Sequence, residues 1–152
     1  MVTQSSGSIN FLAPNQGQTL QVLQDTLRIL EEGDGSQTQY QVFELTGPMN
    51  SGPPPHRHPW AESFFILEGE VELLFGDQTM VGRPGDFVSA AAEQLHTFRI
   101  ISQTARFLVI TSGISASKFF KEMDQSVGHD CSDMDRVMAV ASRHHVIPDA
   151  PV

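Results

Sequence analysis

Short runs of alternating apolar and polar residues, separated by glycine, proline and aspartate, most constrain how this chain can fold. In HTFRI at positions 96–100, for example, rings and aliphatic side chains occupy every second position. Successive side chains of a β-strand point to opposite faces, so this period of two predicts strands. We expect them at about 37–45, 63–67, 71–75, 79–81, 87–90, 96–101 and 106–111. With no internal repeat, this spacing predicts one all-β sandwich or jelly-roll barrel.

The regions on either side of these strands have a different character. The first ten residues are polar, and residues 19–30 fit a helix or a strand by periodicity alone. The GDG at 33–35 indicates a hairpin turn. After residue 113, Ser115 or Ser117 is expected to cap a short helix with an apolar stripe, and a second helix is expected at 133–143. That stripe, Phe119, Phe120 and Met123, is typical of a core or interface.

Potential metal ligands gather in the segment GPPPHRHPWAESFFILEG at 52–69. His56 and His58 point the same way in an extended chain, in which alternate residues share a face. Glu62, past a bend at Pro59, is also an even number of residues away and is expected on the same face. Two imidazoles and a carboxylate suit iron, manganese, nickel, copper or zinc and leave coordination positions open. The three consecutive prolines before His56 stiffen its approach.

A fourth candidate ligand, His96, opens the strand predicted at 96–101 and lies on its apolar face. Strands from two distant segments would then bring all four donors together inside one β structure. We therefore expect one divalent first-row transition metal, held by His56, His58, Glu62 and His96.

The spacing of these residues resembles that of the cupins. Their first motif reads His-x-His, three or four residues, Glu, six residues, Gly, which His56, His58, Glu62 and Gly69 match. In the second motif Gly85, Asp86 and His96 match, whereas Ala91, Glu93 and Ile100 stand where Pro, Gly and Asn are usual. The likeness to single-domain, quercetinase-type cupins runs over roughly residues 20 to 148. It implies a cupin jelly-roll barrel (a double-stranded β-helix) with short C-terminal helices, four metal ligands at the matched positions, and strands at 19–30.

The resemblance also suggests how the chain is organised. We expect an N-terminal arm at 1–18, a barrel at 19–113 and a helical tail at 114–152 packed on the barrel. Open sheet edges and apolar stretches near both ends predict a homodimer, as cupins generally form, in which terminal strands cross to the neighbouring subunit.

Charge and cysteine content restrict the partners and the compartment. With 9 Lys and Arg against 18 Asp and Glu, attraction to nucleic acid or to an anionic membrane surface is disfavoured. The single Cys131 excludes an internal disulfide, and no signal-like or membrane-spanning run is visible, so a cytoplasmic protein is expected.

Three functions fit these features. In the leading one, a metal-dependent dioxygenase acts on a small aromatic, flavonol-like or dicarbonyl substrate, and Glu62 serves as both ligand and general base. The second is a metal-dependent isomerase, lyase or epimerase that does not use dioxygen. The third is a module that binds a small molecule without converting it. Fold and metal site carry over between relatives more reliably than the reaction does.

Overall fold

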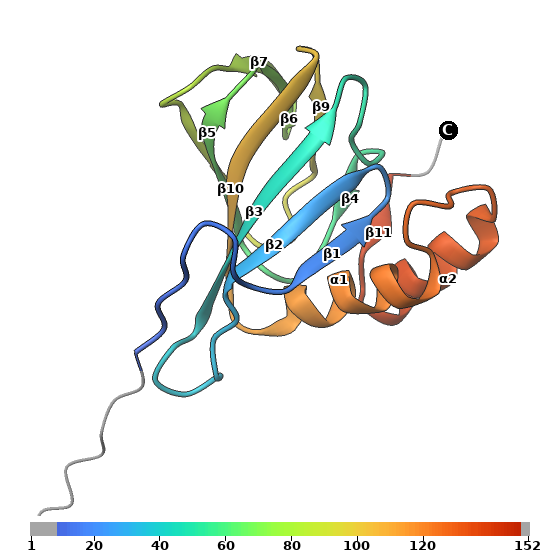
Figure 1. The fold of residues 1–152 in the computed structure, drawn as a ribbon. Helices are drawn as coiled ribbons and strands as arrows, with labels where there is room; N and C mark the ends of the chain where they lie inside the picture. The colour runs from blue at the N-terminus through green and yellow to red at the C-terminus, as the bar shows by residue number, and fades with distance from the viewer. Residues whose placement is uncertain (1–8, 150–152) are drawn as a thin grey trace, which may run out of the picture.

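Two antiparallel β-sheets face each other in the computed structural model, which describes residues 9–149 (Figure 1). Parts of the expected arm (1–8) and tail (150–152) lie outside this range. The described strands are β1 (Thr19–Val22), β2 (Asp25–Glu31), β3 (Tyr40–Pro48), β4 (His56–Arg57), β5 (Glu62–Glu68), β6 (Val71–Phe75), β7 (Gln78–Gly82), β8 (Phe87–Ala90), β9 (His96–Ile100), β10 (Thr104–Ser112) and β11 (Ile147–Pro148). The helices are α1 (Ser115–Ser126) and α2 (Met134–Arg143).

The strand order is that of a jelly roll. Within residues 9–149 one sheet runs β1-β2-β3-β10-β5-β8 and the other β11-β4-β9-β6-β7. Strands that are distant in sequence lie side by side: β10 pairs with β3 on one side and with β5 on the other. The prediction of an all-β jelly-roll fold is confirmed.

The uncertain stretch at 19–30 forms two strands, β1 and β2, which pair in register Val22↔Asp25 through a tight turn. Leu23 in this turn has a φ of 56°, a left-handed conformation that ends β1. The strand predicted from residue 37 instead begins at Tyr40. The reason is Asp34, whose Oδ1 accepts hydrogen bonds from the backbone N–H groups of Ser36 and Thr38 and holds residues 34–38 in a turn.

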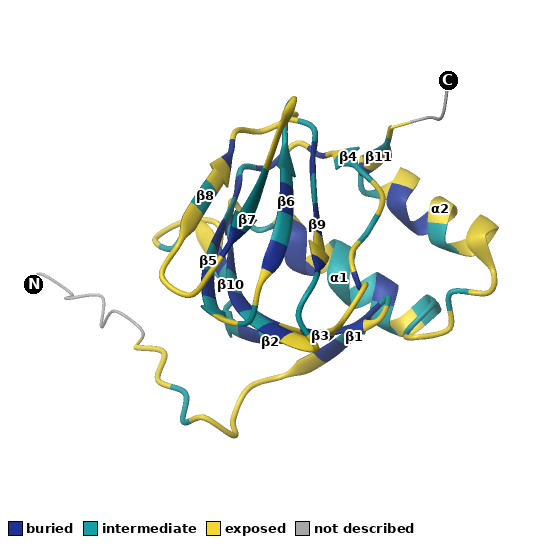
Figure 2. Ribbon diagram, turned by 90° about the horizontal axis from the view of Figure 1, so that it is seen from above, coloured by how far each residue is buried: buried dark blue, intermediate teal, exposed yellow. Residues whose placement is uncertain are grey.

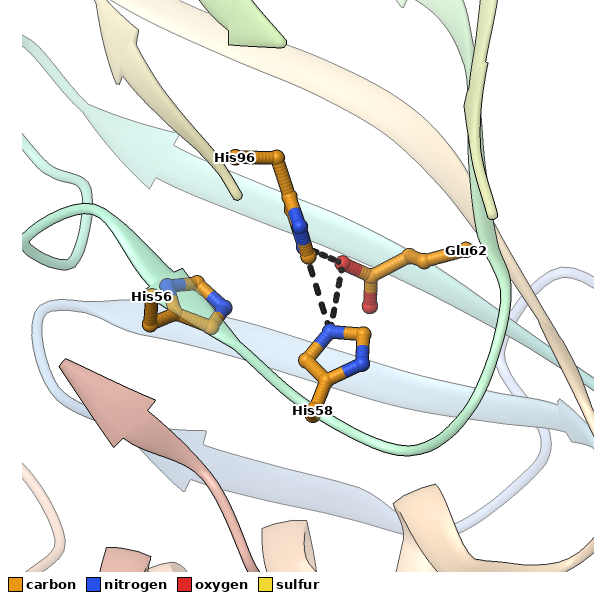
Figure 3. Close-up of side chains that lie close together, drawn as sticks. All are labelled: His56, His58, Glu62 and His96. Carbon is orange, nitrogen blue, oxygen red and sulfur yellow. Dashed lines mark hydrogen bonds and ion pairs between the residues drawn. The ribbon is translucent and has the colours of Figure 1, made fainter. Parts of the chain in front are cut away.

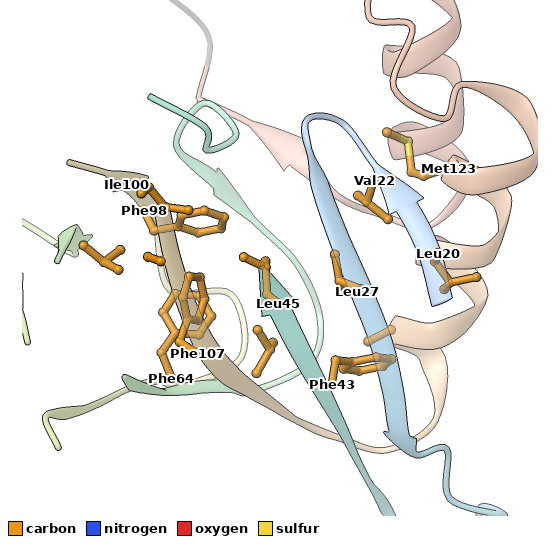
Figure 4. Packing of buried hydrophobic residues seen from close by; sticks show 14 of the residues in the cluster. Leu20, Val22, Leu27, Phe43, Leu45, Phe64, Phe98, Ile100, Phe107 and Met123 are labelled. Atoms are coloured by element: carbon orange, nitrogen blue, oxygen red, sulfur yellow. The ribbon is translucent and has the colours of Figure 1, made fainter. Parts of the chain in front are cut away.

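Alternate residues of both sheets point inward and form the core (Figures 2 and 4). Phe64 of β5 lies against Phe98 of β9 and Phe107 of β10, with ring centroids 5.8 and 5.1 Å away. The contact with Phe98 joins the two sheets across the barrel, because β9 belongs to the other sheet. At the other side, Val22 and Leu27 face Met123 of α1 (Figure 4). The core therefore extends from the barrel interior to the C-terminal helices.

Helix α1 is anchored by a buried glutamine from the neighbouring strand, and the prediction that Ser115 or Ser117 caps it is wrong. Ile114 occupies the N-cap position and makes no side-chain cap. Instead, Gln41 Oε1 accepts from the N–H of Ser117 at 2.9 Å, and Gln41 Nε2 donates to Ser117 Oγ at 2.7 Å. A residue of β3 thus satisfies a helix-start N–H that a local cap would normally bind.

Helix α2 begins as its sequence predicts. Asp133 is the N-cap, and its side chain accepts from the N–H of Arg136. At the other end Arg143 and His144 both contact Glu122 of α1, which ties the two helices together. Between residues 9 and 149, no helix has the length and apolar character needed to cross a bilayer.

Candidate metal centre

The four residues expected as ligands come together at one end of the barrel interior (Figure 3). His56 lies on β4, His58 just beyond it, Glu62 starts β5 and His96 starts β9. The pairing His56↔His96 joins the two distant segments directly. One ligand atom from each side chain lies within 4.8 Å of the others. His58, Glu62 and His96 are almost fully buried, whereas His56 is partly exposed.

Each of the three histidines is oriented by a backbone carbonyl two residues away. The Nδ1 atoms of His56, His58 and His96 lie 2.9, 2.9 and 2.8 Å from the carbonyl oxygens of Pro54, Trp60 and Gln94. A carbonyl oxygen can only accept, so Nδ1 must carry the hydrogen and Nε2 of a neutral ring keeps its lone pair. This is the tautomer in which histidine binds a metal through Nε2.

The inward-facing atoms are packed more tightly than neutral rings alone would allow. His58 Nε2 lies 3.1 Å from His96 Nε2, and His96 Nε2 lies 2.7 Å from Glu62 Oε2. Two nitrogen lone pairs at this distance repel each other, so a proton or a cation is needed between them. The donor set therefore fits a metal ion: three nitrogens and one carboxylate oxygen converge on one buried point.

The electrostatics of the cluster agree with this arrangement. Burial, followed by repulsion from His96, lowers the pKa of His56 to about 4, so this ring is neutral at neutral pH. Burial alone would raise the pKa of Glu62, but hydrogen bonds from His58 and His96 outweigh it and hold this pKa far below its usual range. Burial likewise opposes charge on His96, yet the bond to Glu62 raises its pKa. Glu62 is thus ionised, and a metal ion bound at this point would displace any proton shared between Glu62 and the imidazoles.

The turn before His96 contains a left-handed residue although it lacks the usual motif residues. Glu93, which stands where cupins usually have glycine, adopts a left-handed φ of 67°. Its N–H donates to the carbonyl of His58 at 2.8 Å and so links the two ligand segments. A non-glycine residue in this conformation costs about 1 kcal/mol, which the surrounding contacts must offset.

Trp60 supports the site from behind. Its ring stacks on His58 with centroids 4.3 Å apart and planes 13° from parallel. It is 4% exposed, so it is a packing residue and not a rim residue. Its Nε1 has no hydrogen-bond partner in the described part of the chain.

An apolar cavity of about 120 Å³ opens beside the cluster and is lined by His56, Glu62 and His96. Phe64, Phe98 and Val109 line it, whereas Ile66 and Phe107 belong to the filled core. The stripe expected as core or interface also contributes: Phe119, Phe120 and Met123 of α1 line the cavity, as do residues of α2. The C-terminal helices thus build one wall of the space next to the site.

Asp25 also lines this cavity, and reasoning from the sequence did not find it. Its parity with Leu27 and Ile29 places it on the inner face of β2, a signal that is visible only once residues 25–31 are known to form a strand.

Comparisons with known proteins agree with the fold. A family model described as "Cupin domain" matches residues 44–111, which include all four cluster residues. The quercetin 2,3-dioxygenase of Bacillus subtilis (strain 168) is 27% identical over 104 residues, which cover 67% of this chain. The match spans only 31% of that relative's length. Together these matches support a cupin superfamily protein.

Solved structures share the fold. The polyketide cyclase RemF from Streptomyces resistomycificus aligns with a TM-score of 0.59 and 23% identity, over 69% of this chain and 80% of that one. KdgF from Halomonas sp. aligns with a TM-score of 0.63 and 14% identity, over 71% and 94%. At these identities the likeness concerns the fold alone.

Proposed function

We propose that this protein is a metal-dependent dioxygenase that acts on a small aromatic, flavonol-like or dicarbonyl substrate. The observation that carries the proposal is the convergence of three Nε2 atoms and one carboxylate at the wall of an apolar cavity. The distant likeness to a quercetin 2,3-dioxygenase supports the same reaction class. His56, His58, Glu62 and His96 would hold one divalent first-row ion.

When bound, such an ion would polarise an enolate or hydroxyl oxygen of the substrate and would hold dioxygen next to the substrate. The protein's own residues supply the rest. The apolar wall that includes Phe64, Phe98 and Val109 would orient a flat substrate and exclude water.

Glu62 is suited to accept the substrate proton. Its Oε2 contacts His58 and His96, whereas no hydrogen bond to Oε1 occurs among residues 9–149. The carboxylate is ionised at neutral pH because its pKa is held low, but a low pKa also makes it a weak base. Oε1 would therefore take a proton from a hydroxyl group in the cavity once the bonds of Oε2 to His58 and His96 weaken.

Oxygen consumption tests this proposal. The purified chain would be stripped with a chelator, reloaded separately with Fe²⁺, Mn²⁺, Ni²⁺, Cu²⁺ or Zn²⁺, and mixed with a panel of flavonols, catechols and diketones in an oxygen electrode. We expect metal-dependent oxygen uptake with at least one redox-active ion and none with the stripped protein. No uptake with any metal and substrate pair would contradict the dioxygenase.

A second candidate is a non-redox, metal-dependent isomerase or lyase. RemF, a structural neighbour, is a polyketide cyclase. Conversion of a substrate by the zinc-loaded protein without oxygen would favour this alternative, and ligand recovered unchanged after long incubation would favour a binding module.

A further inference from the structure

The cavity beside the candidate metal centre is apolar except at two places. One is the cluster itself, which contributes His56, Glu62 and His96. The other is Asp25, the single polar lining residue outside the cluster within residues 9–149. A carboxyl group in a wall built from aliphatic and aromatic side chains is unfavourable unless it has a hydrogen-bond partner.

Asp25 is held in one orientation by the chain around it. It is 4% exposed, and its Oδ1 accepts a hydrogen bond from Ser51 Oγ at 2.6 Å. Gly47 leaves space for it, since a Cβ there would lie 2.1 Å from the same Oδ1. Oδ2 has no hydrogen-bond partner among the described residues. One oxygen is thus fixed by the protein, and the other is left for a ligand.

Asp25 lies well away from the cluster. A Cβ at Gly47, which would approach Asp25, would also lie 2.9 Å from Ile100 Cδ1, four residues along β9 from His96. Four residues of strand span roughly 13 Å. This backbone span runs from His96 to Ile100, whose side chain adjoins the site of Asp25, and it is comparable with the long axis of a three-ring aromatic compound.

We propose that Asp25 is a second anchor of the cavity and binds a hydroxyl group at the end of an aromatic substrate remote from the metal centre. The inference rests on the proposed function, because it assumes that the other end of the ligand lies at the His/Glu cluster. It adds a substrate class: rigid, flat molecules with a hydroxyl at each end.

A hydroxyl matches Asp25 better than an amine. It offers one donor to one free oxygen, whereas an ammonium group would leave further N–H donors unpaired against apolar walls. Burial raises the pKa of Asp25 to about 6, although Ser51 and His129 lower it, so the group is an acceptor in weakly alkaline solution.

The test compares two ligands that differ only at the remote end. Zinc-loaded protein without oxygen would be titrated calorimetrically, in weakly alkaline buffer, with 3-hydroxyflavone and with its 4′-hydroxy derivative. We expect the derivative to bind at least about tenfold more tightly, as for a hydrogen bond to a charged group. In Asp25→Ala the ratio of the two affinities should fall to within about twofold.

Leu27→Val is the matched control, since Leu27 lines the same cavity on the same face of β2. It should weaken both ligands equally and keep their ratio, as any purely structural change would. Equal affinities in the wild type, no binding of either flavone, or a ratio that survives in Asp25→Ala would each overturn the inference. If Asp25→Ala does not fold, the wild-type ratio alone decides. Oxygen uptake plays no part in this titration, so a preserved preference together with no uptake in the separate oxygen-electrode panel would reject the dioxygenase and retain the anchor.

Discussion

At the scale of single residues, the backbone decides which nitrogen of each cluster histidine faces the centre. The carbonyls of Pro54, Trp60 and Gln94 bind the three Nδ1 atoms. The inward Nε2 atoms then need no side-chain partner to select their tautomer. His58 is held from two sides, because it contacts His96 and Glu62 on one side and stacks on Trp60 on the other.

Replacing His58 by Ala should therefore remove the metal and leave the barrel folded. Elemental analysis after reloading should show metal falling from about one ion per chain to about a tenth or less, because one of the four ligand atoms is lost and the buried imidazole that stacks on Trp60 leaves a gap beside the other three. Far-ultraviolet circular dichroism would verify the fold. The matched control is His145→Asn at an exposed histidine with a φ of 59°, which asparagine tolerates. Unchanged metal content in His58→Ala would show that this assignment is wrong.

Asp25 should make stability depend on pH in a defined direction. Burial raises its pKa from 3.8 to about 6 in the folded chain. Below about pH 3 the group is protonated in both states; as pH rises to about 6, the unfolded chain loses its proton first. The free energy of unfolding should then fall by up to about 3 kcal/mol across this window.

Asp25→Asn cannot ionise and should lack this contribution. In urea unfolding with a chelator present, the stability of the variant relative to the wild type should rise between about pH 4 and about pH 7. Taking the difference removes the titration of other groups that the two proteins share. A difference that does not change with pH would refute the expectation.

At the scale of secondary-structure elements, α1 depends on a strand for its start. Gln41 of β3 is fully buried, and its Oε1 and Nε2 atoms both form hydrogen bonds with Ser117. Its Nε2 also donates to the carbonyl of Glu32 at 2.7 Å. Since α1 contributes Phe119, Phe120 and Met123 to the cavity, this contact also positions a cavity wall.

Gln41→Leu should destabilise the protein by about 3 kcal/mol, because it leaves the buried N–H and hydroxyl of Ser117 without their partner. Denaturant unfolding would measure the change. The control Gln39→Ala removes an exposed glutamine two residues earlier, and its effect should stay within about 0.5 kcal/mol. Equal effects of the two substitutions would mean that the anchoring contact contributes little.

How far the sequence predicts these elements depends on whether their determinants are local. Alternation located β6 and β8 at their observed bounds, and spacing brought His56, His58, Glu62 and His96 into one set. Periodicity could not separate helix from strand at 19–30, which hid the parity of Asp25. The contact of Gln41 with Ser117 joins residues 76 positions apart, and the wall supplied by α1 also meets side chains of other elements, so no local pattern reports these contacts.

At the scale of the whole molecule, exposed apolar groups and open edges suggest association. Among the described strands β1 and β8 end the larger sheet, and Phe87 on β8 is 61% exposed. Met134 and Met138 on α2 and Ile147 on β11 are exposed as well. Unpaired strand edges and apolar surface are commonly covered by a second subunit.

We therefore expect a homodimer. Size-exclusion chromatography with light scattering should give twice the chain mass of 16.7 kDa at micromolar concentration. Dilution across a wider range would then give the dissociation constant. A strict monomer at micromolar concentration would contradict this expectation.

The placement of the cavity walls has a consequence for how such a protein can diversify. The candidate ligands and their orienting carbonyls come from residues 54–96, whereas the helices after residue 114 contribute a separate part of the cavity wall. Exchange of the C-terminal segment could thus alter which small molecules bind in the cavity without changing the candidate metal ligands. In a library that randomises the cavity-facing positions of α1 and α2, metal retention and ligand choice should vary independently.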